Sequence, residues 1–560
     1  MNTLIDTLPS LDVSQLVQTD SLYISKSGDP YKTSPIGFVT GSTGNSLISP
    51  QAVISAASTN LIPSNPNDGS NVRYLEASGG LQWYNSTTQA WHTLVASGNP
   101  VQLYWIPQGI SVYTGGTYYI SILTGNTNNF GSGTILNPWN GITATGFEKA
   151  MTSVPPYSKI ILGTGTFKTS GVLFGSIRIK SGWNISGAGI DLTTVQLINT
   201  YSGIQDKNIA LSCDASRGDS AAYCTDSTLQ NFTVDCNIYN QTSSTGICCM
   251  GIFQIGNHVT TQNVKIVNWG SRNSTFECFP LYVGGSERVY AQNFTGAKII
   301  NCQVISGDTG AFGMATLITL GVYGFDLLTG DFQGYQVSGL VSGCLADATT
   351  YNQNTNGFTV YGKGSLAIDN VSKNAWAAVY ADTHRYQDVT IKNNILSGCN
   401  VGIFNVFTNG VGNVGTGRFL NNNIYVRTTT TTDHPSTWGM GTVMYTINPS
   451  GAYTIEYLMF SGNVVSYTGF TGALPSSPNP ALMTIMGVNW NNVKSGDILD
   501  NVFSGLFTNS DPRSLRNYIY TGDGVTIGGA GITAGKCQAM TVRGNTAISV
   551  VATGLNINSP

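Results

Sequence analysis

The sequence is poor in charged residues, and this scarcity narrows the class of protein. Only 9% of the 560 residues are Asp, Glu, Lys or Arg, and the net charge is −3. A chain so close to neutral presents no basic field to nucleic acid. An uncharged partner such as a glycan fits this composition better. The shortage of Lys and Glu also argues against a mainly helical protein.

Long apolar runs are missing as well. No stretch of about 18 uninterrupted apolar residues exists, so the sequence predicts no membrane-spanning helix. Hydrophobic residues nevertheless make up 41% of the chain, which argues against a disordered protein. The first residues, MNTLIDTLPSLD, lack the basic start and apolar core of a secretory signal. We therefore expect no export by that route.

Metal-binding patterns are absent too. The four histidines lack metal-ligand spacing and no two cysteines have CxxC spacing, so the sequence predicts no metal site and no cofactor, although loop carboxylates leave Ca²⁺ binding open. Most of the ten cysteines lie beside strand-like residues, which predicts small buried side chains in a protein made in a reducing cytosol. Cys213 and Cys224 flank a polar loop and are the one pair that merits a test for a disulfide.

Apolar and polar residues alternate through residues 159–197. The alternating apolar pairs are Ile160 and Leu162, Ile177 and Ile179, Trp183 and Ile185, and Val195 and Leu197. Glycines interrupt these pairs at short intervals, so the chain makes short strands separated by sharp corners. Such strands are typical of a coil that repeats along an axis rather than of a sandwich.

A single helix signal precedes this stretch. In TGFEKAMTSV, residues 145–154, Thr145 and Glu148 have the spacing of a capping box, and two prolines follow. The apolar side chains on one face are Phe147, Met151 and Val154. Because a stack of coils has an open apolar end, we expect this helix to cover that end.

An asparagine recurs beside the alternating segments after residue 197. These asparagines are Asn231, Asn263, Asn301, Asn370, Asn394, Asn422, Asn463, Asn501 and Asn545. Their spacing is that of solenoid repeats, and VSGLVSGCLAD in the one wide gap predicts a coil without the asparagine. We expect each asparagine to adopt the left-handed conformation at a corner and to hydrogen-bond its counterparts in neighbouring coils. About ten coils at about 4.8 Å each predict a rod of about 50 Å.

The order GSGTILNPWNG, short helix, SKIILGTGTF and IKSGWNISGAGIDLTTVQL resembles the N-terminal part of the pectate-lyase-like right-handed parallel β-helix family. The resemblance is good from about residue 131 to residue 197 and loose after it. The family includes many bacteriophage tailspikes and polysaccharide-active enzymes. It implies an all-β fold, a right-handed parallel β-helix (solenoid) preceded by small N-terminal β modules and a capping helix.

The N-terminal region resembles modules of phage tail fibres and spikes. Residues 1–50, with TDSLYIS and GDPYK, are similar to a virion-attachment module, and residues 51–102 contain the predicted hairpin LQWYNSTTQAWHTL, in which Trp83 and Trp91 flank the turn. We expect a neck and capping helix in residues 103–156 and the β-helix in residues 157–560. The resemblance implies a homotrimer in the virion tail, assembled in the host cytoplasm, acting extracellularly, and attached to other tail proteins through its N-terminal region.

Candidate site residues are weakly marked. Glycoside hydrolysis needs two carboxylates about 5 to 10 Å apart, and the densest polar cluster is YADTHRYQD, residues 380–388. The catalytic candidates are Asp382, Glu277, Asp235 and His384, and the glycan-binding candidates are Trp376, Tyr380, Arg385 and Tyr386. The alternatives are an ordinary polar loop at residues 380–388 and an ion pair of Glu277 with Arg272 or Arg288.

Three functions remain open. The first is a phage receptor-binding protein that recognises a host cell-surface polysaccharide. The second is a depolymerase, a glycoside hydrolase or lyase, acting on that glycan; the sequence lacks the Asp-Asp pair and the Gly-His-Gly of the polygalacturonase pattern, which argues against hydrolysis of that type. The third is a non-viral β-helix adhesin.

Overall fold

The structure is a computed structural model, and the chain divides into two compact units. The units comprise residues Met1–Thr117 with Pro155–Lys159, and Tyr118–Val154 with Ile160–Pro560. The predicted domain limits stay predictions, and residues 1–50 lie outside the described part. The structure describes residues 53–56, 72–75, 80–85, 90–95, 103–106, 109–112, 115–123, 131–171, 177–198, 207–213, 223–241, 248–271, 277–285, 294–305, 307, 314–321, 336–348, 355–382, 388–399, 401–406, 414–427, 442–447, 455–468, 488–490, 493–505, 517–521, 539–548 and 553–557.

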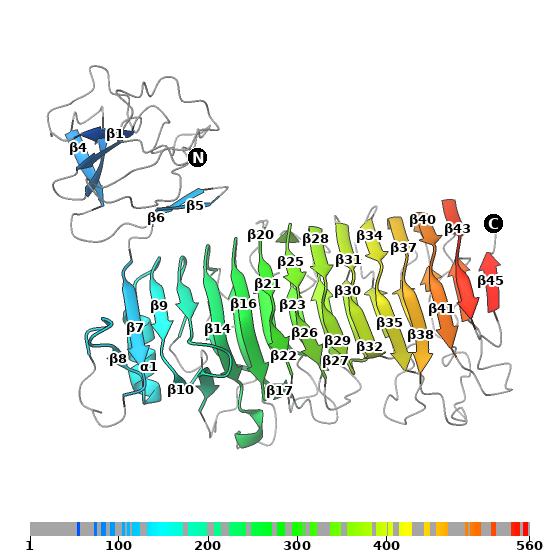
Figure 1. Cartoon of the computed structure of the whole chain (residues 1–560), viewed down its shortest axis with the longest axis horizontal. Helices are drawn as coiled ribbons and strands as arrows, with labels where there is room; N and C mark the ends of the chain where they lie inside the picture. The colour runs from blue at the N-terminus through cyan, green and yellow to red at the C-terminus, as the bar shows by residue number, and fades with distance from the viewer. Residues whose placement is uncertain are drawn as a thin grey trace, which may run out of the picture. The chain divides into compact units, whose positions relative to one another are not determined.

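The first unit contains two small sheets (Figure 1). The first sheet consists of β1 (Val53–Ala56), β2 (Val72–Leu75), β3 (Gly80–Asn85) and β4 (Ala90–Val95), and the second of β5 (Leu103–Ile106) and β6 (Gly109–Val112). Strands β3 and β4 pair antiparallel, with Trp83 opposite His92 and Asn85 opposite Ala90. The predicted hairpin is therefore confirmed.

The second unit is a right-handed parallel β-helix, as predicted. Among the described residues it has a large sheet of 26 strands and a second sheet of 13 strands, and nearly all pairings are parallel. The large sheet contains β7 (Thr117–Ser121), β8 (Trp139–Asn140), β9 (Lys159–Leu162), β10 (Gly165–Thr169), β11 (Asn184–Ser186), β12 (Thr193–Leu197), β14 (Thr228–Asp235), β16 (Thr260–Val267), β20 (Phe294–Thr295), β21 (Lys298–Ile300), β22 (Gln303–Val304), β24 (Gln336–Val337), β25 (Leu340–Ser342), β26 (Leu345–Asp347), β28 (Lys363–Ile368), β29 (Val371–Lys373), β31 (Asp388–Lys392), β32 (Ile395–Cys399), β34 (Val414–Leu420), β35 (Asn423–Arg427), β37 (Ile455–Ser461), β38 (Val464–Thr468), β40 (Val493–Leu499), β41 (Val502–Gly505), β43 (Ala539–Arg543) and β44 (Thr546–Ile548). The second sheet contains β13 (Lys207–Ser212), β15 (Cys248–Ile255), β17 (Gly270–Ser271), β18 (Glu277–Cys278), β19 (Leu281–Gly284), β23 (Met314–Leu320), β27 (Thr355–Val360), β30 (Ala377–Asp382), β33 (Val401–Val406), β36 (Thr442–Ile447), β39 (Val488–Trp490), β42 (Asn517–Thr521) and β45 (Thr553–Ile557).

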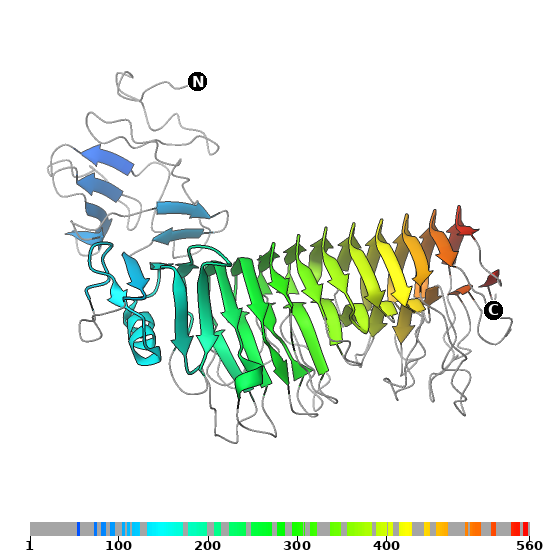
Figure 2. The same cartoon turned by 60° about the horizontal axis from the view of Figure 1, so that its bottom comes forward.

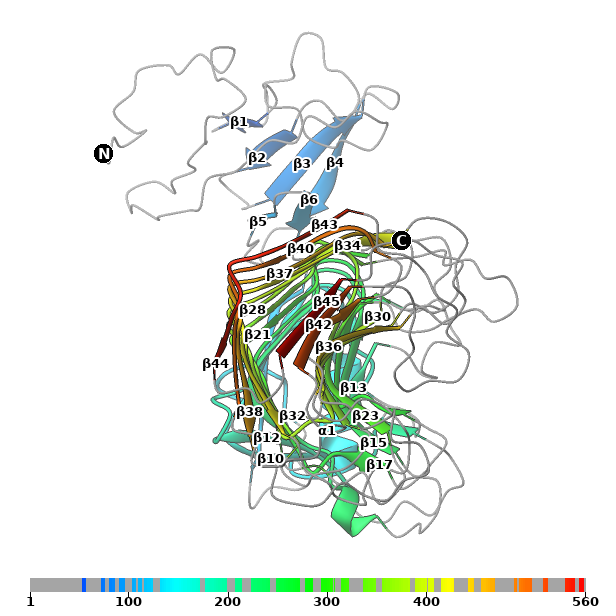
Figure 3. The same ribbon diagram turned by 90° about the vertical axis from the view of Figure 1, so that its right-hand side faces the viewer.

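Each regular coil contributes two strands to the large sheet and one to the second sheet. In one coil, for example, β31 and β32 are followed by β33, and each pairs with its equivalent in the next coil, β34, β35 and β36. Viewed along the axis, the strands of successive coils lie almost over one another (Figure 3). In each strand the alternating apolar residues point into the interior. The core is therefore a stack of apolar rows that run along the axis, and one of these rows contains Phe419, Phe460 and Ile498, all fully buried.

The predicted capping helix is α1 (Ala144–Ser153), at the N-terminal end of the stack (Figure 2). Phe147, Met151 and Val154 are fully buried, as predicted. The predicted capping box is wrong, because Thr143 is the N-cap and accepts a hydrogen bond from the Gly146 amide at 3.0 Å. Glu148 lies too far into the helix to return to the cap, and it accepts the backbone and side-chain donors of Ser170 instead, each at 2.6 Å.

A second, shorter helical turn is the 3₁₀ helix Ile238–Asn240. No helix within the described ranges is both long and apolar enough to cross a membrane.

The corner between the two large-sheet strands of a coil uses two adjacent positions with different roles. The outer position has positive φ and is occupied by Asn301, Gly343, Asp369, Asn393, Asn421, Gly462, Asp500 and Gly544. The next residue points inward, and in six successive coils it is a buried or half-buried asparagine: Asn370, Asn394, Asn422, Asn463, Asn501 and Asn545. Side-chain hydrogen bonds of 2.8 to 3.0 Å join each of these asparagines to its counterpart in the next coil. We call this row the asparagine ladder.

The expectation that one asparagine performs both roles holds for Asn231 and Asn263, which have positive φ and are joined by a hydrogen bond from Asn263 Nδ2 to Asn231 Oδ1 at 3.3 Å, and it is wrong for the later coils. In the last six coils the ladder asparagine follows the left-handed residue, whereas Asn231, Asn263 and Asn301 are themselves left-handed and precede an apolar residue. In the last six coils the two roles fall to adjacent residues, because the left-handed residue lies on the outside of the corner and the amide of the buried ladder is carried by the residue after it. Cys302 and Cys344 continue the ladder position, and Cys344 confirms the predicted coil without an asparagine.

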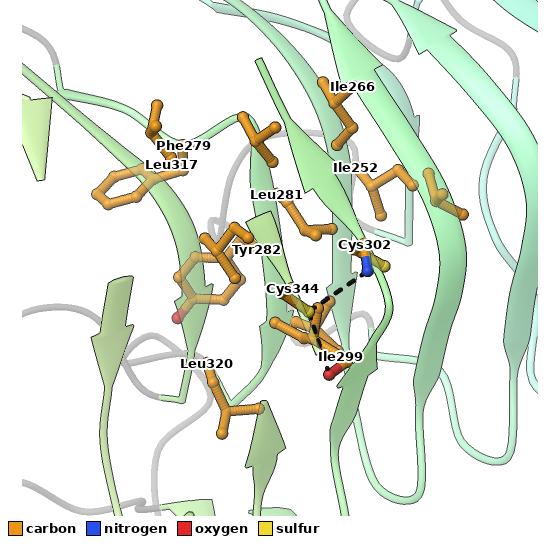
Figure 4. Close-up of a cluster of buried hydrophobic side chains, with 14 of the residues drawn as sticks. Ile252, Ile266, Phe279, Leu281, Tyr282, Ile299, Cys302, Leu317, Leu320 and Cys344 are labelled. Carbon is orange, nitrogen blue, oxygen red and sulfur yellow. Dashed lines mark hydrogen bonds between the residues drawn. The ribbon is translucent and has the colours of Figure 1, made fainter. Parts of the chain in front are cut away.

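The described cysteines are buried, as predicted. Figure 4 shows Cys302 and Cys344 within an apolar cluster that includes Ile299 and Leu281. Burial raises the pKa of the Cys302 thiol well above its ordinary value, and the same holds for the pKa of Cys236 and of Cys278. These thiols therefore stay protonated and serve as small core side chains. Cys537 lies outside the described residues.

Candidate functional site

Polar side chains from four consecutive strands form a strip on the outward face of the large sheet. Asp388 begins β31, and Arg418, Tyr457 and Asp497 come from β34, β37 and β40. The residues that alternate with them are buried in the core: Val389, Phe419, Leu458 and Ile498. Strand alternation therefore turns the four polar groups outward. We call Asp388, Arg418, Tyr457 and Asp497 the polar strip.

The polar strip consists of two hydrogen-bonded pairs. Arg418 Nη1 lies 2.5 Å from Asp388 Oδ1, which also accepts a hydrogen bond from Thr416 Oγ1 at 2.6 Å. Tyr457 donates its hydroxyl to Asp497 Oδ2 at 2.7 Å. The side chains of Arg418 and Asp388 are 38% and 40% exposed, so both are accessible to a ligand while being held in place.

The surroundings of Tyr457 in the polar strip set the pKa of its phenol. Burial raises the pKa of Tyr457 to about 12, and the hydrogen bond to Asp497 and the charge of Asp497 act in the same direction. The guanidinium of Arg418 opposes them and lowers the pKa, so it is close enough to interact with the second pair. At neutral pH the phenol of Tyr457 is therefore neutral and keeps the proton that it donates to Asp497.

The spacing of the two carboxylates decides between binding and hydrolysis. Asp388 pairs in register with Thr416, Thr416 with Tyr457, and β40 follows β37, so Asp388 and Asp497 are three strands apart. At about 4.8 Å per strand this is about 14 Å. Glycosidases hold their carboxyl groups about 5 to 9.5 Å apart. The strip is suited to hydrogen-bonding a ligand rather than to acid–base hydrolysis by these two groups.

Two predicted catalytic acids lie in the second sheet at opposite ends of its strands, Glu277 near their start and Asp382 near their finish. Glu277 pairs with Met314 in β23, and the register through Thr316, Asn356 and Ala377 places Glu277 level with residue 375. Asp382 ends β30, seven residues further along. At about 3.3 Å per residue the two backbones are at least about 23 Å apart. The fold does not bring Glu277 and Asp382 together.

Asp235 lies elsewhere, at the end of β14 in the large sheet. It accepts hydrogen bonds from Gln196 Nε2 at 2.7 Å, from the Asn237 amide at 2.9 Å and from Asn268 Nδ2 at 2.9 Å. These bonds tie three successive coils to one carboxylate. The geometry therefore gives Asp235 a role in holding the coils in register.

Of the remaining predicted site residues, the structure describes some and not others. Trp376 is 8% exposed and directly precedes β30, and Tyr380 is half-buried within it, in register with Thr359 and Phe404. His384, Arg385 and Tyr386 lie outside the described residues. Across the described ranges, no group of three or more His, Cys, Asp and Glu is placed to hold a metal ion.

Sequence reasoning missed three residues of the strip, although a signal for them exists. The predicted cluster ends at Asp388 but does not include Arg418, Tyr457 or Asp497. Arg418 and Asp497 each lie four residues before a ladder asparagine, and Asp388 and Tyr457 each lie six before one. Aligning the repeats on the ladder asparagines would have superimposed these positions on the outward face.

Comparisons with known proteins give low similarity. No protein-family model matches the sequence, and no curated protein matches it. The A-module of the mannuronan C-5 epimerase AlgE4 of Azotobacter vinelandii is 12% identical over 69% of this chain and 96% of that chain, with a TM-score of 0.37. The surface adhesin PfbA of Streptococcus pneumoniae is 11% identical over 78% and 93%, with a TM-score of 0.41. ORF18 of Geobacillus virus E2 is 12% identical over 82% and 70%, with a TM-score of 0.27. The fold is established by the strand pairing of this chain itself.

Proposed function

We propose that this protein is a phage tailspike or tail fibre, and that its polar strip binds a host cell-surface polysaccharide. The polar strip carries the proposal. Its groups stand on rigid strands, one strand per coil, and alternate between two adjacent rows along the axis of the rod, with Asp388 and Tyr457 in one row and Arg418 and Asp497 two residues further along their strands. Sugar hydroxyls accept from a guanidinium and donate to carboxylates, and the ring of Tyr457 offers a face for stacking.

Preorganisation supports binding at this strip. Arg418 is held by Asp388, and Tyr457 is held by Asp497, before any ligand arrives. A ligand that contacts groups already fixed in place loses less conformational entropy in doing so. An extended glycan lying along the axis would meet the two pairs in succession.

The virion role rests on the order of the N-terminal modules. The hairpin of β3 and β4 precedes the β-helix, as an attachment part precedes a projecting part. We infer that the N-terminal region joins other tail proteins and that the protein resides in the virion tail.

Exposed apolar residues support the proposed homotrimer. Ile395 in β32 is 42% exposed and Val464 in β38 is 40% exposed, and the register places them two coils apart in one outward row, in the order Val371, Ile395, Asn423, Val464 and Val502. Four of these five side chains are aliphatic, and such a row on a rigid sheet is suited to burial against another copy of the chain.

The depolymerase and the non-viral adhesin stay as alternative hypotheses. Cleavage would rest on Asp382, Glu277 or His384, since the carboxylates of the strip are too far apart for a hydrolase pair. A lyase would reveal itself by unsaturated products, and an adhesin by binding without virion attachment.

The test is binding of the full chain to a panel of bacterial surface polysaccharides, with product formation followed in parallel. We expect one glycan to bind, and Arg418→Ala to weaken binding at least about 10-fold. Lys265→Ala is the matched control, because Lys265 is another ion-paired cation on the same sheet, 3.7 Å from Asp191. Equal affinity of the two variants would exclude the strip as the site. New reducing ends would indicate a hydrolase, and ultraviolet absorbance in addition would indicate a lyase.

A further inference from the structure

Three side chains at one corner of the β-helix are hydrogen-bonded in series. The corner precedes a strand of the large sheet in three successive coils, before β14, β16 and β21. His258 Nδ1 lies 3.3 Å from Asp226 Oδ1, and His258 Nε2 lies 3.3 Å from Thr295 Oγ1. With its proton on Nδ1, the ring donates to the carboxylate and accepts from the hydroxyl. This order of carboxylate, imidazole and hydroxyl is the order of a catalytic triad for acyl transfer.

The backbone of the corner holds the three groups in this order. The N–H of His258 donates to the carbonyl of Thr295 at 2.7 Å. Asp226 and His258 have φ of 55° and 52°, which is uncommon for residues other than glycine. Gly296 leaves room for the imidazole ring, because a Cβ at this position would lie 2.8 Å from His258 Cδ2. The ring is therefore confined between the neighbouring coils.

A fourth side chain places hydrogen-bond donors beside the hydroxyl. Asn257 Oδ1 accepts the backbone N–H of Thr295 at 2.8 Å. This bond identifies the other end of the amide as Nδ2, whose two N–H groups have no partner among the residues that the structure describes. An asparagine amide held beside a nucleophile is one of the groups that stabilise the oxyanion formed in acyl transfer. The corner therefore contains a nucleophile, a base, a carboxylate that orients the base, and an oxyanion donor.

These groups lie on the outer surface of the coils. Phe294 is fully buried, so strand alternation turns the next residue, Thr295, outward. The side chains of His258 and Asp226 are 32% and 20% exposed, and Thr295 is half-buried. A substrate can therefore reach the hydroxyl and the ring without any movement of the core.

The hydroxyl also stands in register with the polar strip. Thr295 pairs with Val337, Val337 pairs with Lys363, and Lys363 pairs with Asp388. Three strand steps of about 4.8 Å place Thr295 and Asp388 about 14 Å apart along the axis. A glycan that lies on the polar strip and extends toward the N-terminal end of the stack would bring its substituents to Thr295.

We propose that Asp226, His258 and Thr295 form an esterase site, which removes small carboxylic acyl groups from hydroxyls of the glycan. Thr295 Oγ1 attacks the carbonyl carbon of the ester while its proton passes to His258 Nε2. The bond to the alcohol oxygen breaks, and the alcohol leaves with the proton from Nε2. Water, deprotonated by the same nitrogen, then cleaves the acyl-threonine to the carboxylic acid and restores the hydroxyl. The glycan as carrier rests on the proposed function, whereas the ester chemistry does not.

The first experiment is covalent trapping in the full chain. The folded protein is treated with a fluorophosphonate, digested and analysed by mass spectrometry. An activated hydroxyl forms an O–P bond, fluoride leaves, and the proton passes to the base. We expect phosphonylation of Thr295, and at least about 100-fold less in His258→Asn, which removes the base but tolerates the left-handed conformation. Absence of label on Thr295, or equal labelling of the two proteins, would overturn the proposal.

The second experiment is hydrolysis of 4-nitrophenyl acetate. Thr295→Val should lower kcat/KM at least about 100-fold, whereas Thr295→Ser keeps a hydroxyl and should stay within about 10-fold of the wild type. Asn257→Asp keeps the acceptor for the Thr295 N–H but removes the donors, so kcat should fall about 100-fold with little change in KM. The control is Thr546→Val, an exposed threonine at the other end of the sheet, which should leave the rate unchanged. Equal rates in the wild type and Thr295→Val would refute the esterase.

The two experiments separate this site from the proposed function, because neither requires a glycan. Binding of a glycan without labelling of Thr295 would overturn the esterase and leave the polar strip as a binding site. Labelling of Thr295 without binding of any glycan would support the ester chemistry and reject the glycan as its substrate. The labelling of the wild-type chain decides the matter if a variant fails to fold.

Discussion

Asn422 donates its side-chain N–H to the side-chain oxygen of Asn463 across 3.0 Å, from one coil to the next. The same Nδ2 donates to the carbonyl of Ile391, and Oδ1 accepts from the backbone and the side chain of Asn394. The amide thus uses both donors and both acceptor positions, and it is fully buried. No residue other than asparagine reaches all four partners from this position, because Gln is longer and Asp lacks the donors.

Replacing Asn422 by Ala should therefore destabilise the β-helix strongly. The change leaves the Asn394 donors and the Ile391 carbonyl buried without their partner, and each such group costs about 1 to 3 kcal/mol. We expect the free energy of unfolding to fall by about 3 to 5 kcal/mol in urea denaturation. The neighbouring Asn423 is exposed, so Asn423→Ala should change it by no more than about 0.5 kcal/mol. Similar losses in both variants would contradict a ladder role.

The contribution of Tyr457 to stability should depend on pH in the alkaline range. Its pKa is about 12 in the folded chain, above the ordinary value of about 10. The folded state therefore binds this proton more tightly, and the resulting stability is complete below about pH 10 and is lost as the pH rises through 12. The stability difference between wild type and Tyr457→Phe, from urea midpoints, should be constant from pH 7 to 10 and change between pH 10 and 12. A difference that is constant up to pH 12 would refute this assignment.

Removing the carboxylate of Glu148 should loosen the junction between α1 and the first coils. Its Oε1 accepts three hydrogen bonds, from Thr169 and from the amide and hydroxyl of Ser170. Glu148→Ala should cost about 2 to 3 kcal/mol and lower the thermal midpoint, because the buried Thr169 hydroxyl loses a partner. Ser153→Ala on the exposed end of the same helix is the control and should be close to neutral. Equal midpoints in the two variants would show that the Glu148 contacts are dispensable.

Charges introduced into the exposed aliphatic row should dissociate the proposed homotrimer. Ile395→Asp combined with Val464→Asp places two carboxylates where we propose that copies of the chain meet, and a buried unpaired charge is costly. Sedimentation velocity should show trimers for the wild type and monomers for the double variant. Lys168→Asp, exposed in β10 at the other end of the sheet, should stay trimeric. A wild-type monomer would reject the homotrimer outright.

Substitutions of Asp497 and of Asp388 should show whether the glycan contacts both pairs of the polar strip. Asp497→Asn keeps the shape but removes the charge that the Tyr457 hydroxyl contacts. Isothermal titration with the glycan found for the wild type should show an affinity loss of about 5- to 30-fold, that is about 1 to 2 kcal/mol. Asp388→Asn should give a similar loss if the glycan spans both pairs. Loss from only one of the two would shorten the proposed site to that pair.

The fold could be predicted because its signals are local. Alternation in pairs such as Trp183 and Ile185, the glycine corners and the apolar face of Phe147 and Met151 all lie within short stretches, and each fixed one part of the architecture. The helix cap was misplaced by two residues because Thr143 and Thr145 are both plausible caps. They are distinguished only by the hydrogen-bond partner of the Glu148 side chain, which is Ser170 rather than the helix cap.

The site could not be predicted in the same way because it depends on which strands become neighbours. Arg418 and Asp497 are 79 positions apart, and segments of different lengths separate the strands that carry them. The polar cluster at residues 380–388 attracted attention through its density in the sequence, yet Asp382 and Asp388 belong to different sheets. Proximity along the chain misleads in a solenoid, where position within the repeat determines which side chains share a face.

The asparagine ladder also has a consequence for the length of the rod. Each ladder residue uses the same donors and acceptors toward the coil before it and the coil after it, so a coil is chemically interchangeable with its neighbours at this position. Duplication or deletion of a gene segment that encodes one whole coil would leave every remaining amide with a partner. The length of the rod is therefore a heritable quantity that can change in uniform steps while the hydrogen bonding of the ladder is kept.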